Sequence, residues 1–138
     1  MGRIIALDYG KKRTGIAVSD PLKMIAGGLV TLPSKDTIGF LQQYVSDNAV
    51  DLFLLGDPRR MDYKPSENRK RVLEFKENLH RTFPKIEIQM IDERFTSFLA
   101  HKAMIQGGLK KKDRQNKALI DELSATILLQ SFLETKQT

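Results

Sequence analysis

The chain contains no cysteine and no tryptophan, and its only histidines are His80 and His101. Without cysteine there can be no disulfide framework, no thiol nucleophile and no thiolate-bound zinc, which fits a cytoplasmic protein. Because histidine is also scarce, a bound metal would have to be a hard cation held by oxygen ligands. No hydrophobic run is long enough to span a membrane and no signal peptide precedes the first predicted strand, so we expect a cytoplasmic protein without membrane contact.

The chain has 138 residues, and we expect them to form a single domain over 1–138. Its formal net charge of +6 favours an anionic partner only weakly. The basic residues gather in five clusters, each of which alone is more simply explained as solvated surface charge. The clusters are Lys11–Lys12–Arg13, Arg59–Arg60, Arg69–Lys70–Arg71, Arg94, and Lys110–Lys111–Lys112 with Arg114. Considered together with the acidic residues below, they indicate a phosphate-binding surface.

Hydrophobic periodicity predicts five strands and four helices. The strands are expected at 3–9, 14–19, 29–32, 51–55 and 86–91, and the helices at about 36–48, 66–83, 97–106 and 116–134. Short turns join the first three strands, which predicts an antiparallel meander, whereas each of the last two strands follows a helix and is expected to be parallel. The predicted fold class is therefore α/β, with a mixed five-stranded sheet and helices on both faces.

Three acidic residues stand where acids are energetically unfavourable. Asp8 ends the hydrophobic run 4–7, Glu93 follows the alternating stretch 86–92, and Asp121 lies within a hydrophobic helical stretch. Buried carboxylates are rare unless they are paired or bind a metal. Because each of these acids has basic residues nearby in the sequence, the pattern suggests a divalent-metal site that acts on a polyanion.

Each acid also has a simpler explanation. Asp8 could bond the backbone of a turn, Asp92 could cap the following helix, and Asp121 could pair with a buried arginine. Strand alternation puts Asp92 and Glu93 on opposite faces, so we favour Glu93 as the site acid and retain Asp92 as an alternative. Glu122 falls on another helix face than Asp121 and is expected to be solvated.

Carboxylates that converge on Mg²⁺ or Mn²⁺ can organise the hydrolysis of a phosphodiester. The metal polarises the phosphoryl oxygen, generates hydroxide from water and stabilises the leaving oxygen, while lysine and arginine offset the phosphate charge. Neither histidine has a partner in the pattern that would make a serine–histidine nucleophile. A metal-dependent nuclease is the reaction class that this residue set favours.

The stretch 5–20, IALDYGKKRTGIAVSD, closely resembles the opening signature of the YqgF family. These bacterial proteins are similar to Holliday junction resolvases and are also regarded as nucleases that mature the 5′ end of pre-16S ribosomal RNA. The segments 92–97 and 120–133 resemble the second and third signatures of the family. The resemblance implies a ribonuclease H-like fold, with Asp8, Glu93 and Asp121 as the catalytic acids and metal ligands. It also implies that Lys12 and Arg13 contact nucleic acid.

The sequence departs from the family pattern after the fourth predicted strand. Family members usually have Gly-Leu-Pro and then Asp-Gly in this region, whereas this chain has Gly56–Pro58 and Met61–Tyr63. Asp57 thereby adds an acid at a strand end, and we keep Asp57 and Asp92 as possible further metal ligands. These departures bear on substrate preference more than on reaction type.

The residues leave three functions open. The first is a nuclease for structured RNA or branched DNA, acting as a monomer or a homodimer, with pre-16S ribosomal RNA favoured and Holliday junctions as the alternative substrate. The second is a phosphotransferase that uses Asp8, Gly10 and Gly15 as a phosphate-binding hairpin, although such enzymes need a second domain to close over ATP. The third is a nucleic-acid-binding module without turnover.

Overall fold

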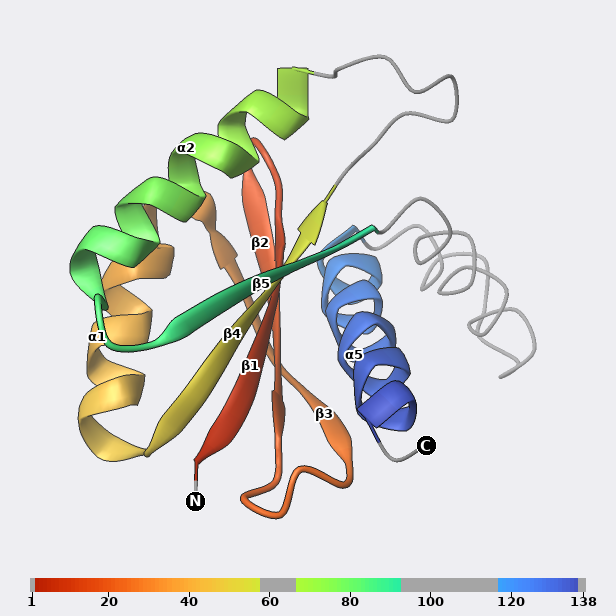
Figure 1. Cartoon of the computed structure of the whole chain (residues 1–138). Coiled ribbons are helices and arrows are strands. Elements are labelled where there is room, and N and C mark those ends of the chain that lie inside the picture. Colours follow the sequence, from red (N-terminus) through yellow and green to blue (C-terminus); the bar gives the residue numbers. More distant parts are fainter. Residues whose placement is uncertain (1, 58–66, 93–116, 137–138) are drawn as a thin grey trace.

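The computed structural model describes residues 2–57, 67–92 and 117–136. Five strands form one mixed sheet in the order β3-β2-β1-β4-β5 (Figure 1). The elements are β1 (Arg3–Tyr9), β2 (Arg13–Ser19), β3 (Ala26–Pro33), the 3-10 helix η1 (Ser34–Asp36), α1 (Thr37–Asp47), β4 (Val50–Asp57), α2 (Glu67–Thr82), β5 (Glu87–Asp92) and α5 (Lys117–Lys136).

The predicted strand directions are confirmed. β1 pairs antiparallel with β2, and β2 pairs antiparallel with β3, as the short connections require. β4 and β5 join the sheet as parallel strands on the other side of β1. The helix predicted at 97–106 lies outside the described residues. None of the described helices is long and hydrophobic enough to cross a membrane.

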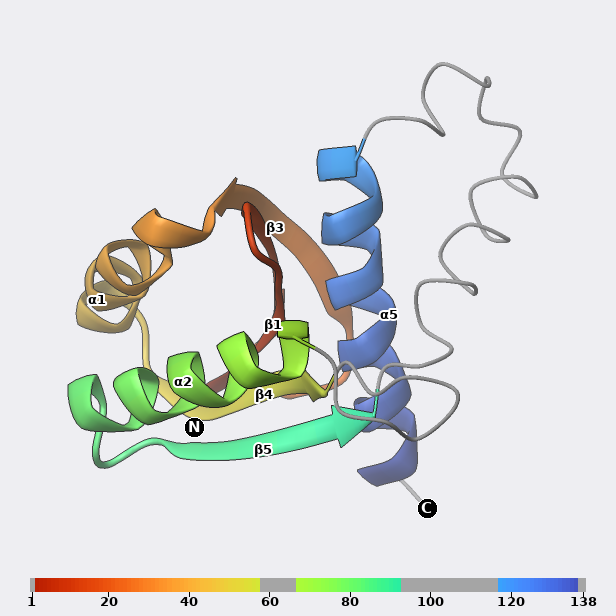
Figure 2. The same ribbon diagram turned by 90° about the horizontal axis from the view of Figure 1, so that it is seen from above.

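Helices cover both faces of the sheet, with α1 and α2 on one side and α5 on the other (Figures 1 and 2). Alternation along β1 supplies both cores, because Ile4 and Ala6 pack toward α5 whereas Ile5 and Leu7 pack toward α1 and α2. The helix predicted at 116–134 is present as α5. Its buried residues are Ser124, Ala125, Leu128, Leu129, Phe132 and Leu133.

Two glycines let α5 approach the sheet closely. A β-carbon at Gly15 of β2 would clash with the backbone of Asp121, and one at Gly28 of β3 would lie 2.5 Å from Oε1 of Glu122. Glu122 is therefore half-buried against β3, whereas the sequence led us to expect it in solvent. The Gly27–Gly28 pair belongs to β3, which begins three residues earlier than predicted because these residues pair with β2.

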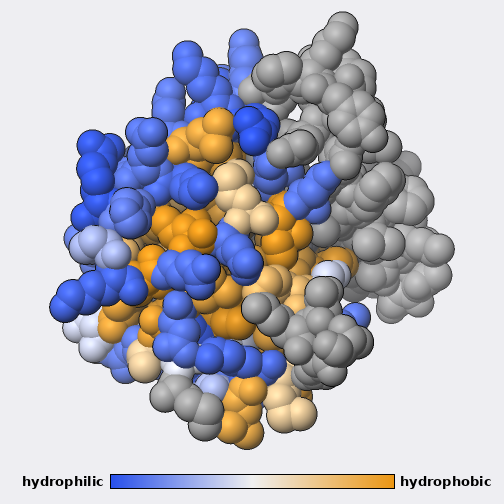
Figure 3. Space-filling model, viewed as in Figure 1, coloured by the Kyte–Doolittle hydropathy of each residue, from blue (hydrophilic) through white to orange (hydrophobic). Residues whose placement is uncertain are grey.

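β5 is an edge strand of the sheet that the structure describes. Its hydrophobic residues Ile88, Met90 and Ile91 are only half-buried. The space-filling view, seen from the side on which β5 lies in Figure 1, shows hydrophobic side chains between polar ones near the centre (Figure 3). The edge is thus amphipathic rather than strongly hydrophobic.

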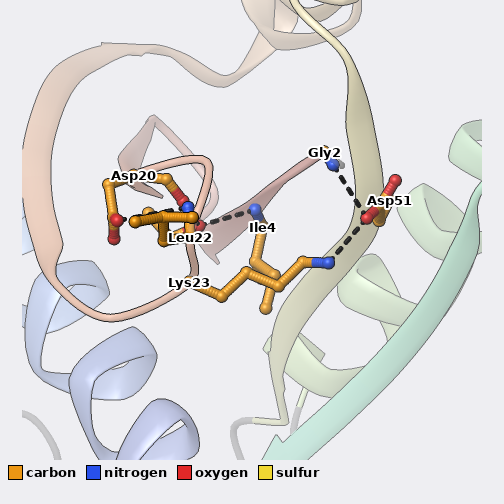
Figure 4. A network of polar contacts seen from close by, with 7 residues as sticks. Gly2, Ile4, Asp20, Leu22, Lys23 and Asp51 are labelled. Atoms are coloured by element: carbon orange, nitrogen blue, oxygen red, sulfur yellow. Dashed lines mark hydrogen bonds and ion pairs between the residues drawn. The ribbon is translucent and has the colours of Figure 1, made fainter.

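A hydrogen-bonded network closes the end of the sheet where β1 begins (Figure 4). The Asp20 carboxylate accepts hydrogen bonds from the backbone nitrogens of Ile25 and Met24, both at 2.8 Å, and these bonds lower the pKa of Asp20. Asp51 accepts hydrogen bonds from Nζ of Lys23 at 2.6 Å and from the backbone nitrogen of Gly2 at 3.0 Å, and the pKa of Asp51 is lowered chiefly by Lys23. The β2–β3 loop is therefore fixed to β1 and β4.

Candidate functional site

Asp8 lies near the other end of β1 and belongs to the α5 side of the sheet. Its neighbours Leu7 and Tyr9 both contact the core beneath α1 and α2. The Tyr9 ring stacks on Phe75 of α2, with 4.2 Å between the ring centroids and 16° between the planes. Since successive side chains of a strand alternate between faces, the Asp8 carboxylate is directed to the face that α5 covers.

The first turns of α5 lie beside Asp8. Asp8 is paired across the ladder with Gly15, and the space above Gly15 is taken by the carbonyl oxygen of Asp121. Directly opposed residues of an antiparallel pair have α-carbons only about 4.5–5.5 Å apart. The structure therefore brings together Asp8 and Asp121, two of the three acids singled out in the sequence.

Asp121 has a basic partner. Nε of Arg13, the first residue of β2, donates a hydrogen bond of 2.9 Å to Oδ2 of Asp121. The two side chains remain 36% and 25% exposed, so the pair faces solvent. It lies at a surface pocket of about 320 Å³ that is lined by Gly10, Lys11, Lys12, Arg13 and Asp121.

The turn between β1 and β2 presents Lys11 and Lys12 to solvent, and Ser34 holds its backbone in place. The backbone nitrogen of Ser34 donates to the carbonyl oxygen of Lys12 at 2.9 Å, and the Ser34 hydroxyl donates to that of Gly10 at 2.5 Å. Since a hydroxyl has one proton, the buried Thr14 hydroxyl must be the donor in its 2.9 Å hydrogen bond to Ser34. This anchor was missed in the sequence, because Ser34 belongs to no predicted strand or helix and no local pattern links it to the turn.

Asp57 lies on the opposite face of the sheet from Asp8. It shares the α2 side of β4 with Phe53 and Leu55, and its Oδ1 accepts a hydrogen bond of 2.9 Å from Nε of Arg69 in α2. The Asp57 side chain is 7% exposed, so this is a buried, paired carboxylate. The hypothesis that Asp57 adds a ligand beside Asp8 gains no support from this arrangement. Arg69 was not expected as a partner of Asp57, because in the sequence it stands within the basic cluster Arg69–Lys70–Arg71.

Asp92, the last residue of β5, is paired with Asp57 and is exposed. Ile88 and Met90 pack toward α2, so alternation assigns Asp92 to that side, as predicted, whereas Ile91 packs toward α5. The part of the chain that the structure describes contains no group of three acidic or histidine side chains able to hold a metal ion. The remaining predicted site residues lie outside the described ranges; they are Glu93, Arg59, Arg60, Arg94, Lys110, Lys111, Lys112 and Arg114.

This arrangement of a mixed sheet with helices on both faces is the fold of the Holliday junction resolvases. Thermus thermophilus RuvC in complex with a Holliday junction substrate aligns with a TM-score of 0.55 and 15% identity, over 99% of this chain and 96% of RuvC. Fowlpox virus resolvase, solved with Holliday junction DNA, aligns with a TM-score of 0.59 and 14% identity, over 99% of each chain. At such low identity the likeness establishes the shared fold alone. It confirms the predicted ribonuclease H-like fold class.

The chain belongs to the RuvX family, described as Holliday junction resolvase, whose sequence profile matches residues 2–135. A relative from Azobacteroides pseudotrichonymphae named "Putative pre-16S rRNA nuclease" is 58% identical over 134 residues, which is 97% of each chain. A relative of the same name from Parabacteroides distasonis is 56% identical over 137 residues, covering 99% of this chain and 98% of the relative. The resemblance to the YqgF family is thereby confirmed over nearly the whole length.

Proposed function

We propose that this chain is a metal-dependent nuclease that hydrolyses phosphodiester bonds of structured RNA and matures the 5′ end of pre-16S ribosomal RNA. The observation that carries the proposal is the juxtaposition of Asp8 on the central strand with Asp121 on α5. The names of the two full-length relatives support the RNA substrate.

The donor set fits a hard divalent cation. Asp8 and Asp121 supply carboxylate oxygens on one face of the sheet, and Asp121 is reachable from solvent and already accepts a cationic partner. We assign the third carboxylate to Glu93, because the segment 92–97 resembles the second signature of the family, in which this position is a catalytic acid. Mg²⁺ or Mn²⁺ held by these acids would supply Lewis-acid stabilisation and a hydroxide nucleophile.

The turn that carries Lys11, Lys12 and Arg13 is the proposed phosphate-binding element. Its basic side chains border the pocket that contains Asp121, and Ser34 fixes the backbone of the turn. A fixed turn binds a phosphate at lower entropic cost than a mobile loop. We propose that Arg59, Arg60, Arg94, Lys110, Lys111, Lys112 and Arg114 extend the nucleic-acid contact.

Branched DNA is the second candidate substrate. The description of the family and the fold shared with resolvases favour it. Resolution of a four-way junction needs two coordinated cuts and hence paired active sites, whereas RNA maturation can be performed by a monomer. Coordinated cutting of a junction would therefore indicate paired active sites, whereas cutting of RNA alone would require only a monomer.

The experiment compares cleavage of a pre-16S RNA fragment and of a four-way DNA junction in Mg²⁺ and in Mn²⁺. Asp8→Asn and Asp121→Asn should each reduce cutting by about 10²–10³-fold, because each removes a charged oxygen ligand that stabilises the transition state. Asp47→Asn is the matched control, since Asp47 is an exposed acid in α1 on the other face of the sheet. Binding of the wild type without cutting in either metal would refute the nuclease and leave a binding module.

A further inference from the structure

Arg13 is bonded to one of the acids proposed to hold the metal, although it belongs to the turn proposed to hold phosphate. We propose that Arg13 is a positioning residue that exchanges partners. Its guanidinium neutralises Asp121 while no metal is bound, and it is released to a phosphate of the nucleic acid when a divalent cation occupies that carboxylate. This inference rests on the proposed function and concerns the coupling between metal and substrate at that site.

The ion pair is suited to exchange. It consists of a single hydrogen bond, from Nε of Arg13 to Oδ2 of Asp121, rather than a two-pronged contact. Both side chains are partly exposed, and ion pairs of this kind are weak in water. A divalent cation that is shared with a second carboxylate, Asp8, interacts with Asp121 more strongly than one guanidinium does.

The packing decides which partner moves. The backbone of Asp121 lies directly against Gly15, so the first turns of α5 cannot shift toward β2. Arg13 is long and borders an open pocket of about 320 Å³ beside Lys11 and Lys12. Loss of the bond therefore requires a rotamer change of Arg13 alone, and its guanidinium then joins the two lysines.

Exchange of this kind couples the two ligands. If metal binding frees Arg13 for phosphate, phosphate binding at Arg13 must favour metal binding by the same factor, because coupling free energies are reciprocal. The metal site would then fill most readily when the nucleic acid is present. Arg13 thus acts through Asp121 and through the substrate phosphate rather than on the reacting atoms.

The first test measures Mn²⁺ affinity by calorimetry in the absence of nucleic acid. Arg13→Gln should tighten Mn²⁺ binding by about three- to fivefold, because a competitor for Asp121 is lost. Lys12→Gln removes the same charge from the same exposed turn and should have a clearly smaller effect. Equal effects of the two substitutions would mean that Arg13 only repels the cation through its charge, as any basic residue there would. Weaker Mn²⁺ binding in Arg13→Gln would mean that Arg13 holds Asp121 in position for the metal. Either result overturns the exchange.

The second test measures RNA binding in EDTA, where cutting cannot occur. Asp121→Asn releases Arg13 without metal, so it should tighten binding by about three- to fivefold in the wild type and in a Lys12→Gln background. In an Arg13→Gln background the gain should vanish. If it persists there, simple repulsion by Asp121 explains it and the inference fails.

Neither test depends on turnover, so the two proposals can fail separately. If both expectations are met but no substrate is cut, the exchange of partners by Arg13 stands and the nuclease proposal fails. If the wild type cuts but Arg13→Gln and Lys12→Gln have identical Mn²⁺ affinities, the nuclease proposal stands and the exchange fails. Absence of Mn²⁺ binding in every protein would refute both.

Discussion

Gly15 and Asp121 are in backbone contact: a β-carbon on Gly15 would collide with the carbonyl oxygen of Asp121 and lie 2.9 Å from the amide nitrogen of Glu122. A residue in the middle of β2 thereby sets how closely α5 can approach the sheet. Since Asp8 is paired with Gly15, the same contact sets the separation of the two acids. Packing and site geometry are thus controlled by one missing side chain.

Gly15→Ala should lower both the stability of the fold and the affinity for Mn²⁺. The methyl group meets backbone rather than a flexible side chain, so α5 must move, and overpacking of this kind costs about 1–3 kcal/mol in the free energy of unfolding. Gly27→Ala is the matched control in β3, because a β-carbon there has its nearest neighbour at 4.0 Å. Urea unfolding and Mn²⁺ affinity measure the two effects, and equal results for the two variants would contradict the close-packing argument.

Asp57→Asn should destabilise the fold without weakening the metal site. Asp57 is buried and accepts a charged hydrogen bond from Arg69, and loss of such a bond costs about 1.5–3 kcal/mol. Since Asp57 lies on the α2 side of the sheet, Mn²⁺ affinity should stay close to that of the wild type. Asp8→Asn should instead weaken Mn²⁺ binding without destabilising the fold. A large loss of Mn²⁺ affinity in Asp57→Asn would restore Asp57 as a ligand.

RNA binding should weaken steeply with salt through Lys11 and Lys12. Each phosphate contact contributes about 0.7–0.9 to the slope of log K against log salt concentration, so the double alanine variant should lower that slope by about 1.5. Lys85→Ala is a suitable control, because Lys85 is exposed just before β5, at the end of the sheet remote from Asp8. A slope unchanged by the double substitution would remove this turn from the binding surface.

Acid should destabilise the β2–β3 loop and the start of β1. The pKa of Asp51 is lowered from 3.8 chiefly by its hydrogen bond from Lys23, and that of Asp20 by backbone hydrogen bonds from Ile25 and Met24. A lowered pKa in the folded state means that the stabilisation is complete above pH 3.8 and is lost as the pH falls through the folded values.

Lys23→Met removes the hydrogen bond that chiefly lowers the pKa of Asp51, and it should flatten the fall in stability as the pH drops below 3.8. Urea unfolding at several pH values in this range measures the effect. An acid-induced fall as steep as that of the wild type would show that the Lys23–Asp51 pair does not contribute.

The strands and the cores were predictable because their signals are local. The hydrophobic run in β1 and the helical stripe from Ser124 to Phe132 depend only on which residues are hydrophobic and at what spacing. That Asp8 and Asp121 share a site was suggested by two acids standing in hydrophobic stretches and by the resemblance to the family signatures; hydrophobic spacing alone did not place them together.

The sequence allowed an arginine partner for Asp121, but it did not identify Arg13 or Arg69 as the partners of the acids, because these pairs depend on tertiary contacts. Nothing near Asp57 in the sequence indicates that Arg69, 12 residues later in the chain, reaches it. Gly27 and Gly28 precede the strand predicted at 29–32, yet they lie inside β3 because they pair with Val18 and Ala17 of β2. The Ser34 anchor likewise depends on a turn that is more than twenty residues earlier in the chain.

Helix α5 comes after all five strands in the chain, and it supplies half of one hydrophobic core as well as Asp121. Without this helix, one face of the sheet would be bare and Asp121 would be missing from the proposed metal site. Docking of one element therefore completes the hydrophobic core and joins the second described carboxylate to the first.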